Sequence, residues 1–233
     1  MKRLWLILFV LPLFAQEPLK YSINFPEITQ SNMPVLFLMH GYGSNEKQFN
    51  KLIEELNNKY LIVSMRAPFN FMVIKNRWYE YSISDGDTLS NQTQIDLSTK
   101  RIIKTIEHIK EEYNIDEKKI FIGGFSQGGA MAQIMLLSQI STRISGLVLL
   151  GTRSIEEQKL RKTLRKLKPI PVLWMHGLSD EIIKYEESIE LVNIFEDEGW
   201  DVVKITHKKG HVIPLELHED VKKFIQEVFS NNS

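Results

Sequence analysis

Residues 120–134 read IFIGGFSQGGAMAQI, and this stretch decides the fold. Its first three residues form an apolar run typical of a strand, and from Ala130 onward the apolar residues recur at helical spacing. Between the two, Gly124 to Gly128 fits the pattern G-x-S-x-G, in which a serine occupies a sharp turn from a strand into a helix. The sequence therefore predicts that Ser126 presents its hydroxyl above the end of a buried strand. A glycine-rich turn that merely joins the two elements is the alternative.

The alternation of strand and helix extends outward from this stretch in both directions. Apolar runs typical of buried strands lie at residues 35–39, 61–64, 147–150, 172–175 and 202–206. Helical patterns lie at residues 49–60, 102–113, 130–137, 189–195 and 217–228. This order predicts an α/β fold with a mostly parallel central sheet, flanked by helices on both faces, and a ligand site beyond the carboxyl ends of the strands.

Composition limits the classes of function. A chain of 233 residues, 43% hydrophobic and 25% charged, fits one globular domain with a sizeable core, which we expect over residues 16–233. The 29 basic and 29 acidic residues balance, so no positive field favours nucleic acid as a partner. The absence of cysteine excludes disulfides, thiolate metal sites and a cysteine nucleophile.

The first 15 residues have the pattern of a signal peptide. Lys2 and Arg3 precede an apolar run from Leu4 to Phe14, and Ala15 suits a cleavage site. The run is shorter than the ~20 residues that a spanning helix needs. We therefore expect an exported protein, periplasmic or secreted. A membrane-associated protein that keeps this segment is the alternative.

Two further residues complete a pattern for nucleophilic catalysis. A serine hydroxyl needs a base within hydrogen-bond reach, and the base needs a third group to orient it. Asp180 follows the predicted strand at 172–175, and His211 follows the one at 202–206. The chain order Ser, Asp, His is typical of triads on this kind of sheet. We predict Ser126 as nucleophile, His211 as base and Asp180 as the orienting acid.

Each partner has an alternative. Asp180 is also a residue type that caps a following helix, and His211 could be an ordinary surface histidine. Glu181 is the second candidate for the acid and His207 the second candidate for the base. Both fit less well, because Glu181 begins an apolar stretch and His207 lies at the end of its strand.

Acyl transfer also requires hydrogen-bond donors for an oxyanion. The loop His40-Gly41-Tyr42-Gly43 follows the first buried strand, and its glycines permit a tight turn. We predict that the backbone NH groups of Tyr42 and Gln127 form the oxyanion hole. A tight turn with no donor role is the alternative.

With these motifs, the chain resembles the phospholipase/carboxylesterase family of α/β-hydrolases, which includes acyl-protein thioesterases. The resemblance covers nearly all of residues 16–233. It is carried by the His40–Gly43 loop, Arg66-Ala67-Pro68, Trp78-Tyr79, the string GFSQGG at 124–129, His176-Gly177 with Asp180, and Gly210-His211.

The resemblance implies a single-domain α/β-hydrolase fold, the same triad and oxyanion donors, and no metal or organic cofactor. We expect hydrolysis of carboxylic esters or thioesters of short to medium acyl chains through an acyl-enzyme, and the resemblance places Trp78 and Tyr79 in the loop that borders the acyl groove. The sequence departs from the family at Glu80, where an aspartate is usual. A serine peptidase or amidase, or a non-catalytic binding protein, are the alternative functions. The sequence defines no oligomeric state.

A basic segment lies at Lys159–Lys168, with Leu160, Leu164 and Leu167 at helical spacing. Such a helix could contact an anionic lipid surface. A solvated helix face is the commoner use of this pattern.

Overall fold

The computed structural model describes residues 17–26, 32–55, 60–84 and 87–231. The predicted signal peptide at residues 1–15 lies outside this part of the chain. Within it, no helix combines the length and the apolar character needed to cross a membrane.

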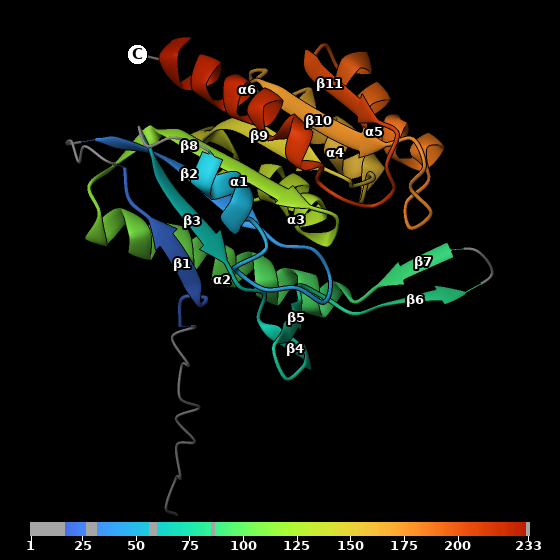
Figure 1. Ribbon diagram of the computed structural model, residues 1–233, viewed down its shortest axis with the longest axis horizontal. Coiled ribbons are helices and arrows are strands. Elements are labelled where there is room, and N and C mark those ends of the chain that lie inside the picture. Colours follow the sequence, from blue (N-terminus) through green and yellow to red (C-terminus); the bar gives the residue numbers. More distant parts are fainter. Residues whose placement is uncertain (1–16, 27–31, 56–59, 85–86, 232–233) are drawn as a thin grey trace, which may run out of the picture.

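The central element is a seven-stranded sheet in the order β1-β3-β2-β8-β9-β10-β11 (Figure 1). Its strands are β1 (Tyr21–Asn24), β2 (Met33–Met39), β3 (Leu61–Met65), β8 (Ile115–Phe125), β9 (Ile144–Leu150), β10 (Val172–Gly177) and β11 (Val202–His207). The pairs from β3 to β11 are parallel, and β1 pairs antiparallel with β3 at one edge. The predicted mostly parallel sheet is confirmed, and β1 is an addition that the sequence patterns did not indicate.

Helices cover both faces of this sheet, as predicted. One face carries α2 (Gln92–Glu112), α3 (Gln127–Leu136), α4 (Glu157–Leu164) and α5 (Tyr185–Asp197), and the other carries α1 (Asn50–Glu55) and α6 (His218–Asn231). Short 3₁₀ turns lie at Ser141–Arg143 and Leu215–Leu217. The interior of the sheet is apolar on both sides, because alternate residues of each central strand pack against the two helix layers.

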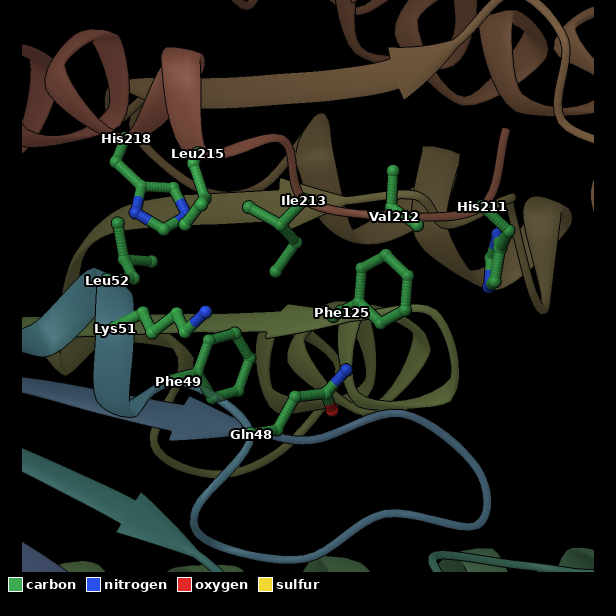
Figure 2. Close-up of a pocket in the computed structure, with 10 residues that line it drawn as sticks. All are labelled: Gln48, Phe49, Lys51, Leu52, Phe125, His211, Val212, Ile213, Leu215 and His218. Atoms are coloured by element: carbon green, nitrogen blue, oxygen red, sulfur yellow. The ribbon is translucent and has the colours of Figure 1, made fainter. Parts of the chain in front are cut away.

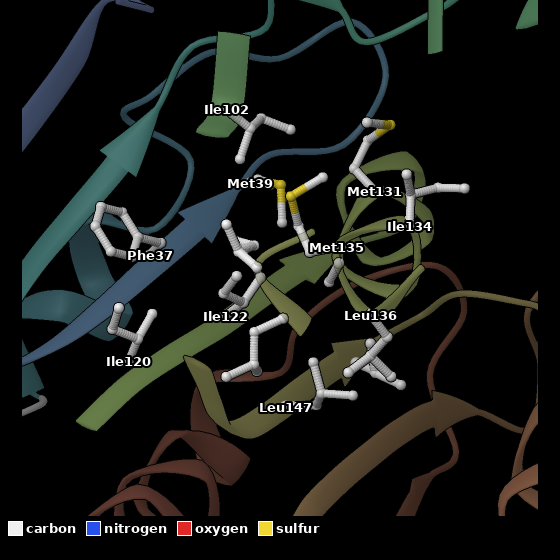
Figure 3. Packing of buried hydrophobic residues seen from close by; sticks show 14 of the residues in the cluster. Phe37, Met39, Ile102, Ile120, Ile122, Met131, Ile134, Met135, Leu136 and Leu147 are labelled. Atoms are coloured by element: carbon white, nitrogen blue, oxygen red, sulfur yellow. The ribbon is translucent and has the colours of Figure 1, made fainter. Parts of the chain in front are cut away.

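The packing at the centre of the larger face explains why the sequence patterns were so regular. Phe37 and Met39 of β2 meet Ile102 of α2 and Met131 and Met135 of α3 in one continuous cluster (Figure 3). All of these side chains are fully buried. This core holds the carboxyl ends of β2 and β8 in a fixed position relative to the start of α3.

Two hairpins stand outside the sheet. Strands β4 (Phe69–Met72) and β5 (Lys75–Arg77) pair antiparallel, and so do β6 (Tyr81–Ser84) and β7 (Asp87–Ser90). In Figure 1 the β6–β7 hairpin projects from the body of the molecule beyond the sheet. Neither hairpin was predicted, and both lie on the side of the molecule where the candidate site is found.

Candidate active site

Ser126 lies at the junction between β8 and α3 in a conformation that few residues adopt. Its backbone dihedrals are φ 54° and ψ −117°, which is a strained region for a residue with a side chain. The Ser126 NH donates to the Leu150 carbonyl of β9 at 2.8 Å, which fixes the turn to the sheet. The predicted strand–turn–helix context of the G-x-S-x-G motif is therefore present.

The glycines around Ser126 are required by close backbone contacts. A Cβ atom on Gly124 would lie 2.3 Å from the Gly128 carbonyl carbon, and a Cβ on Gly128 would lie 1.9 Å from the Met39 carbonyl oxygen. Both separations are far below van der Waals contact. The start of α3 therefore packs directly onto the ends of β2 and β8, a fit that needs glycine at both positions.

The loop after β2 is shaped by a buried histidine. Nε2 of His40 accepts a hydrogen bond from the Ala67 NH at 2.9 Å, so Nδ1 carries the proton and donates to the Gly41 carbonyl at 2.7 Å. Burial lowers the pKa of His40 to about 4, so the ring is neutral at neutral pH. Trp78 Nε1 donates to the His40 carbonyl at 2.8 Å. These bonds fix the course of the loop that carries Tyr42.

The two predicted oxyanion donors border one cavity. Tyr42 follows β2, and Gln127 is the first residue of α3. Among the hydrogen bonds of the described residues, neither backbone NH has an acceptor. The first NH groups of a helix lack partners within the helix and favour negative charge. The arrangement is therefore suited to bind an oxyanion.

The side chain of Gln127 has a separate structural task. Its Oε1 accepts from the Trp78 NH at 2.8 Å, and its Nε2 donates to the Tyr79 carbonyl at 2.8 Å. Ser98 of α2 donates to the Trp78 carbonyl at 2.6 Å. The segment after β5 is thus tied to the start of α3.

Asp180 and His211 form a direct hydrogen-bonded pair, as the sequence order predicted. The Asp180 Oδ2 atom lies 2.6 Å from His211 Nδ1. The Asp180 Oδ1 atom accepts from the NH groups of Ile182 and Ile183, each at 2.9 Å. Oδ1 thus closes the turn after β10, while Oδ2 contacts His211. Asp180 does not cap the following helix, because α5 begins at Tyr185 and its N-cap residue is Lys184.

The charge state of Asp180 follows from these contacts. Burial acts to raise the pKa of this carboxyl, but the hydrogen bonds from Ile183 and His211 outweigh burial and hold the pKa below its usual value. Asp180 is therefore ionised at neutral pH. It can hold Nδ1 of His211 as the protonated nitrogen, so that Nε2 is the one available to exchange a proton.

Ser126 and His211 line the same cavity. No hydrogen bond joins Ser126 Oγ to His211 Nε2 among the contacts of the described residues. The imidazole packs against the ring of Phe125, the neighbour of Ser126, with 4.7 Å between ring centroids. Catalytic hydrogen bonds are often long without a substrate and shorten when one binds. A reaction would require Ser126 Oγ and His211 Nε2 to come within hydrogen-bond distance.

This space, which we call the main cavity, has a volume of about 530 Å³. Besides the residues already named, its walls include Tyr81, Ile83, Thr88, Ser90, Ala130, Thr152, Arg153, Ile155, Ile182, Ile183 and Glu187. The volume suits a small-molecule ligand. One wall belongs to the β6–β7 hairpin, which the sequence patterns did not reveal.

Arg153 fixes this wall. Its Nη2 donates to Thr88 Oγ1 of β7 at 2.5 Å, and its Nη1 pairs with Glu187 of α5 at 2.7 Å. Arg153 was not among the predicted site residues. It links the projecting hairpin to the helix on the far side of the cavity.

The two aromatic residues that were expected to border the acyl groove have different surroundings in the structure. Tyr79 lines the main cavity, and burial raises the pKa of its hydroxyl to about 12, so the hydroxyl stays protonated. Trp78 is fully buried and does not line this cavity. Its hydrogen bonds to His40 and Gln127 make it a structural support behind the site.

The second candidates for acid and base do not reach the main cavity. Glu181 is exposed to solvent, and His207 lies behind the site, where burial and the nearby His176 lower its pKa. His176 is fully buried, with Nε2 at 2.9 Å from the Ile183 carbonyl and 3.5 Å from Asp180 Oδ2. Within the described residues no cluster of histidine and carboxylate side chains could hold a metal ion.

Comparisons with known proteins agree with this geometry. The model of the phospholipase/carboxylesterase family matches residues 25–229. The chain is 30% identical to acyl-protein thioesterase 1 homolog 1 of Dictyostelium discoideum over 179 residues, which are 72% of this chain and 77% of that protein. It is 24% identical to acyl-protein thioesterase 1 of Candida albicans over 225 residues, which are 89% of this chain and 97% of that protein.

Solved structures show the same fold. Esterase PE8 superposes with a TM-score of 0.79 at 18% identity, covering 91% of this chain and 100% of its own. The carboxylesterase of Bacillus cereus superposes with a TM-score of 0.72 at 22% identity, covering 90% of this chain and 94% of its own. Fold, site geometry and sequence similarity agree: the chain belongs to the phospholipase/carboxylesterase family of α/β-hydrolases and is an esterase-type hydrolase.

Proposed function

We propose that this protein hydrolyses carboxylic esters or thioesters of short to medium acyl chains through an acyl-enzyme. Ser126 is the nucleophile, His211 the base and Asp180 the group that orients His211. The backbone NH groups of Tyr42 and Gln127 stabilise the oxyanion. One observation carries the proposal: the strained Ser126 lies at the start of α3 in the same cavity as the His211–Asp180 pair.

The chemistry follows from this arrangement. Ser126 Oγ attacks the acyl carbon while His211 Nε2 takes its proton, and negative charge develops on the carbonyl oxygen. The two unpartnered NH groups and the amino end of α3 stabilise that charge. The bond to the leaving oxygen or sulfur breaks as His211 returns the proton to it. Water then attacks the acyl-enzyme with the same base, which releases the acid and restores Ser126.

The test is turnover of 4-nitrophenyl butyrate, combined with labelling by a fluorophosphonate probe. We expect Ser126→Ala to lose hydrolysis by at least about 10³-fold and to lose labelling, since removing the nucleophile removes the covalent route. Ser179→Ala, at an exposed serine next to Asp180 in the chain, is the control and should keep both. Equal rates for wild type and Ser126→Ala would show that Ser126 is not the nucleophile.

We also propose that the protein is exported after cleavage near Ala15, from the basic head and apolar run of residues 1–15. Expression of the full chain with a carboxyl-terminal tag, followed by fractionation and amino-terminal sequencing, tests this proposal. A tagged protein that stays in the cytoplasm with Met1 intact contradicts it.

Contact with an anionic lipid surface through the Lys159–Lys168 segment remains a weaker proposal. In α4 and the residue after it, Arg161 and Arg165 already pair with Asp197 and Glu198 at the end of α5. Lys162 and Lys166 form no ion pair among the described residues. Liposome binding that is unchanged when Lys162, Arg165 and Lys166 are replaced by glutamine would remove this proposal.

A further inference from the structure

A second cavity adjoins the main one on the other side of His211. It has a volume of about 240 Å³ and lies between α1 and the segment that runs from His211 into α6 (Figure 2). We call it the side cavity. Gln48, Phe125 and His211 line both cavities. The imidazole and the Phe125 ring therefore stand where the two spaces meet.

The nucleophile and the oxyanion donors do not line the side cavity, and this limits which part of a substrate it can hold. Ser126, Tyr42 and Gln127 line the main cavity and do not line the side cavity. The reacting carbonyl must lie close to the nucleophile and the oxyanion donors, so it belongs in the main cavity. Of the proposed catalytic groups, only His211 lines the side cavity. It can therefore hold only a part of the substrate that lies beyond the reacting bond, on the side of the histidine.

The part that meets the base is the leaving group. Nδ1 of His211 is held by Asp180, so Nε2 must deliver the proton to the departing oxygen or sulfur. The atoms attached to that oxygen or sulfur must then pass along the imidazole. The side cavity offers them a space on the other side of the shared residues Gln48, Phe125 and His211.

The walls of the side cavity are mainly apolar, with Gln48, His211 and His218 as polar side chains and Lys51 as a cation. Leu52 and Ile213 face the space, and the large apolar side chains of Val212 and Leu215 are 47% and 53% exposed at its rim. Lys51 extends from α1 toward the same space (Figure 2), and within the described residues it forms no ion pair. An apolar ligand with an anionic group would cover the exposed side chains and place a negative charge near the Lys51 amine.

We propose that the side cavity is the leaving-group subsite and that it selects an alcohol or thiol with an apolar body and an anionic group. The proposal rests on the esterase mechanism above. In the acylation step the Ser126 Oγ–acyl bond forms and the bond from the acyl carbon to the leaving oxygen or sulfur breaks. The Ser126 proton passes through His211 to the leaving group, which departs through the side cavity as a neutral alcohol or thiol at the reacting end.

Two esters with the same acyl group test the selection of charge. They are 4-(butanoyloxy)benzoate, whose leaving group is anionic, and 4-(butanoyloxy)benzamide, whose leaving group is neutral and of similar size. We expect Lys51→Gln to lower the kcat/KM ratio of the anionic to the neutral ester by about twofold to fivefold, the upper part of the range for one exposed charge pair. The matched control Lys162→Gln, on the opposite helix layer, should leave the ratio unchanged.

A second variant tests occupancy of the cavity itself. Leu215→Trp places a larger ring at the exposed rim and should lower kcat/KM for both aryl esters, while methyl butanoate, which has the same acyl group and a small leaving group, is unaffected. An unchanged charge ratio in Lys51→Gln overturns the charge selection. A Leu215→Trp enzyme that changes its preference among acyl lengths instead of leaving groups would assign the cavity to the acyl chain and overturn the subsite.

These outcomes are distinct from failure of the proposed function. If the wild-type protein hydrolyses neither ester and Ser126 is not labelled by the fluorophosphonate, the esterase mechanism itself is wrong. If both esters are hydrolysed with equal efficiency by wild type and both variants, only the inference on the side cavity is wrong.

Discussion

The turn at Ser126 and the β6–β7 hairpin border the same cavity, but they are built in opposite ways. The turn is packed so closely that a methyl group on Gly128 would meet the Met39 carbonyl. The hairpin projects from the body, and Tyr81 and Ile83 on it are 46% and 72% exposed. The chemistry is thus placed on the core of the fold, and one wall of the substrate space is placed on an extension.

We expect substitutions in the two regions to change different quantities. Substitutions near the turn and the Asp180–His211 pair should act on kcat or on the free energy of unfolding, because the core determines their geometry. Substitutions on the hairpin and its supports should act mainly on KM, because few contacts join them to the core.

Asp180→Asn should cause the largest loss. The amide cannot hold the protonated Nδ1 of His211 in place of a carboxylate, so the imidazole adopts the wrong tautomer and kcat should fall on the order of 10⁴-fold. The control is Glu181→Gln, a charge-neutralising change at the exposed neighbour, which should alter kcat by less than about twofold. Steady-state kinetics on 4-nitrophenyl butyrate compares the two. Equal losses would give Glu181 the role of the acid.

Gly128→Ala tests the packing of the turn. The added Cβ would lie 1.9 Å from the Met39 carbonyl oxygen, so the start of α3 must move away from β2. We expect the free energy of unfolding to fall by about 3 kcal/mol or more, with loss of activity. Gly199→Ala is the comparison: its φ is +80° but nothing lies within 4 Å of the new Cβ. It should cost only about 1 kcal/mol, from backbone strain. Urea unfolding of both variants measures the difference.

Lowering the pH tests how much His40, the buried histidine at the start of the His40–Gly43 loop, contributes to stability. The pKa of His40 is lowered to about 4 in the folded state, whereas the unfolded chain has an ordinary histidine pKa. Between these values the unfolded chain binds more protons, so stability is full near pH 7 and falls as the pH decreases toward 4. His40 alone should account for about 2 kcal/mol of the loss between pH 7 and pH 5.

The measurement is urea unfolding at both pH values for wild type and His40→Gln. The pKa values of His176 and His207 are lowered too, so the variant should keep part of the pH dependence and lose the share that belongs to His40. The same loss in both proteins would show that His40 does not contribute.

Arg153→Met tests the attachment of the hairpin. The variant keeps the length of the side chain but removes the hydrogen bond to Thr88 and the ion pair with Glu187. We expect KM to rise by about threefold to tenfold, with kcat within about twofold, since one charged hydrogen bond is lost. Arg165→Met, at a paired arginine far from the cavity, is the control. A fall in kcat with unchanged KM would contradict the expectation that substitutions on the hairpin and its supports act mainly on KM.

The sequence was most informative where the structure is buried. Strands β2, β8 and β10 were predicted because their residues face helices on both sides, which requires an unbroken apolar run. Ser126 and Asp180 could be proposed because each follows such a strand or the turn beyond it. His211 follows β11, which was expected to be buried but is a partly exposed strand at the edge of the sheet. The hydrogen bond between Asp180 and His211 is consistent with the order of the elements, and their catalytic roles stay a prediction.

The two hairpins and the contacts of Arg153 were not predicted, and the reasons are physical. Strands of four residues with exposed side chains, such as Tyr81–Ser84, carry little apolar periodicity. A signal was present, because the Asp85-Gly86 dipeptide between two short alternating runs is typical of a tight hairpin turn. Arg153 has no comparable signal, because its partners Thr88 and Glu187 are distant in the chain. The structural role of Trp78 likewise depends on contacts with His40 and Gln127, which sequence spacing does not contain.

Gln127 connects the turn at Ser126 with the segment that leads into the β6–β7 hairpin. Its backbone NH is one of the two oxyanion donors that we propose, and its side chain holds the peptide groups of Trp78 and Tyr79, from which the β6–β7 hairpin extends. At Gln127, unlike at Arg153, a substitution should therefore change kcat and KM together.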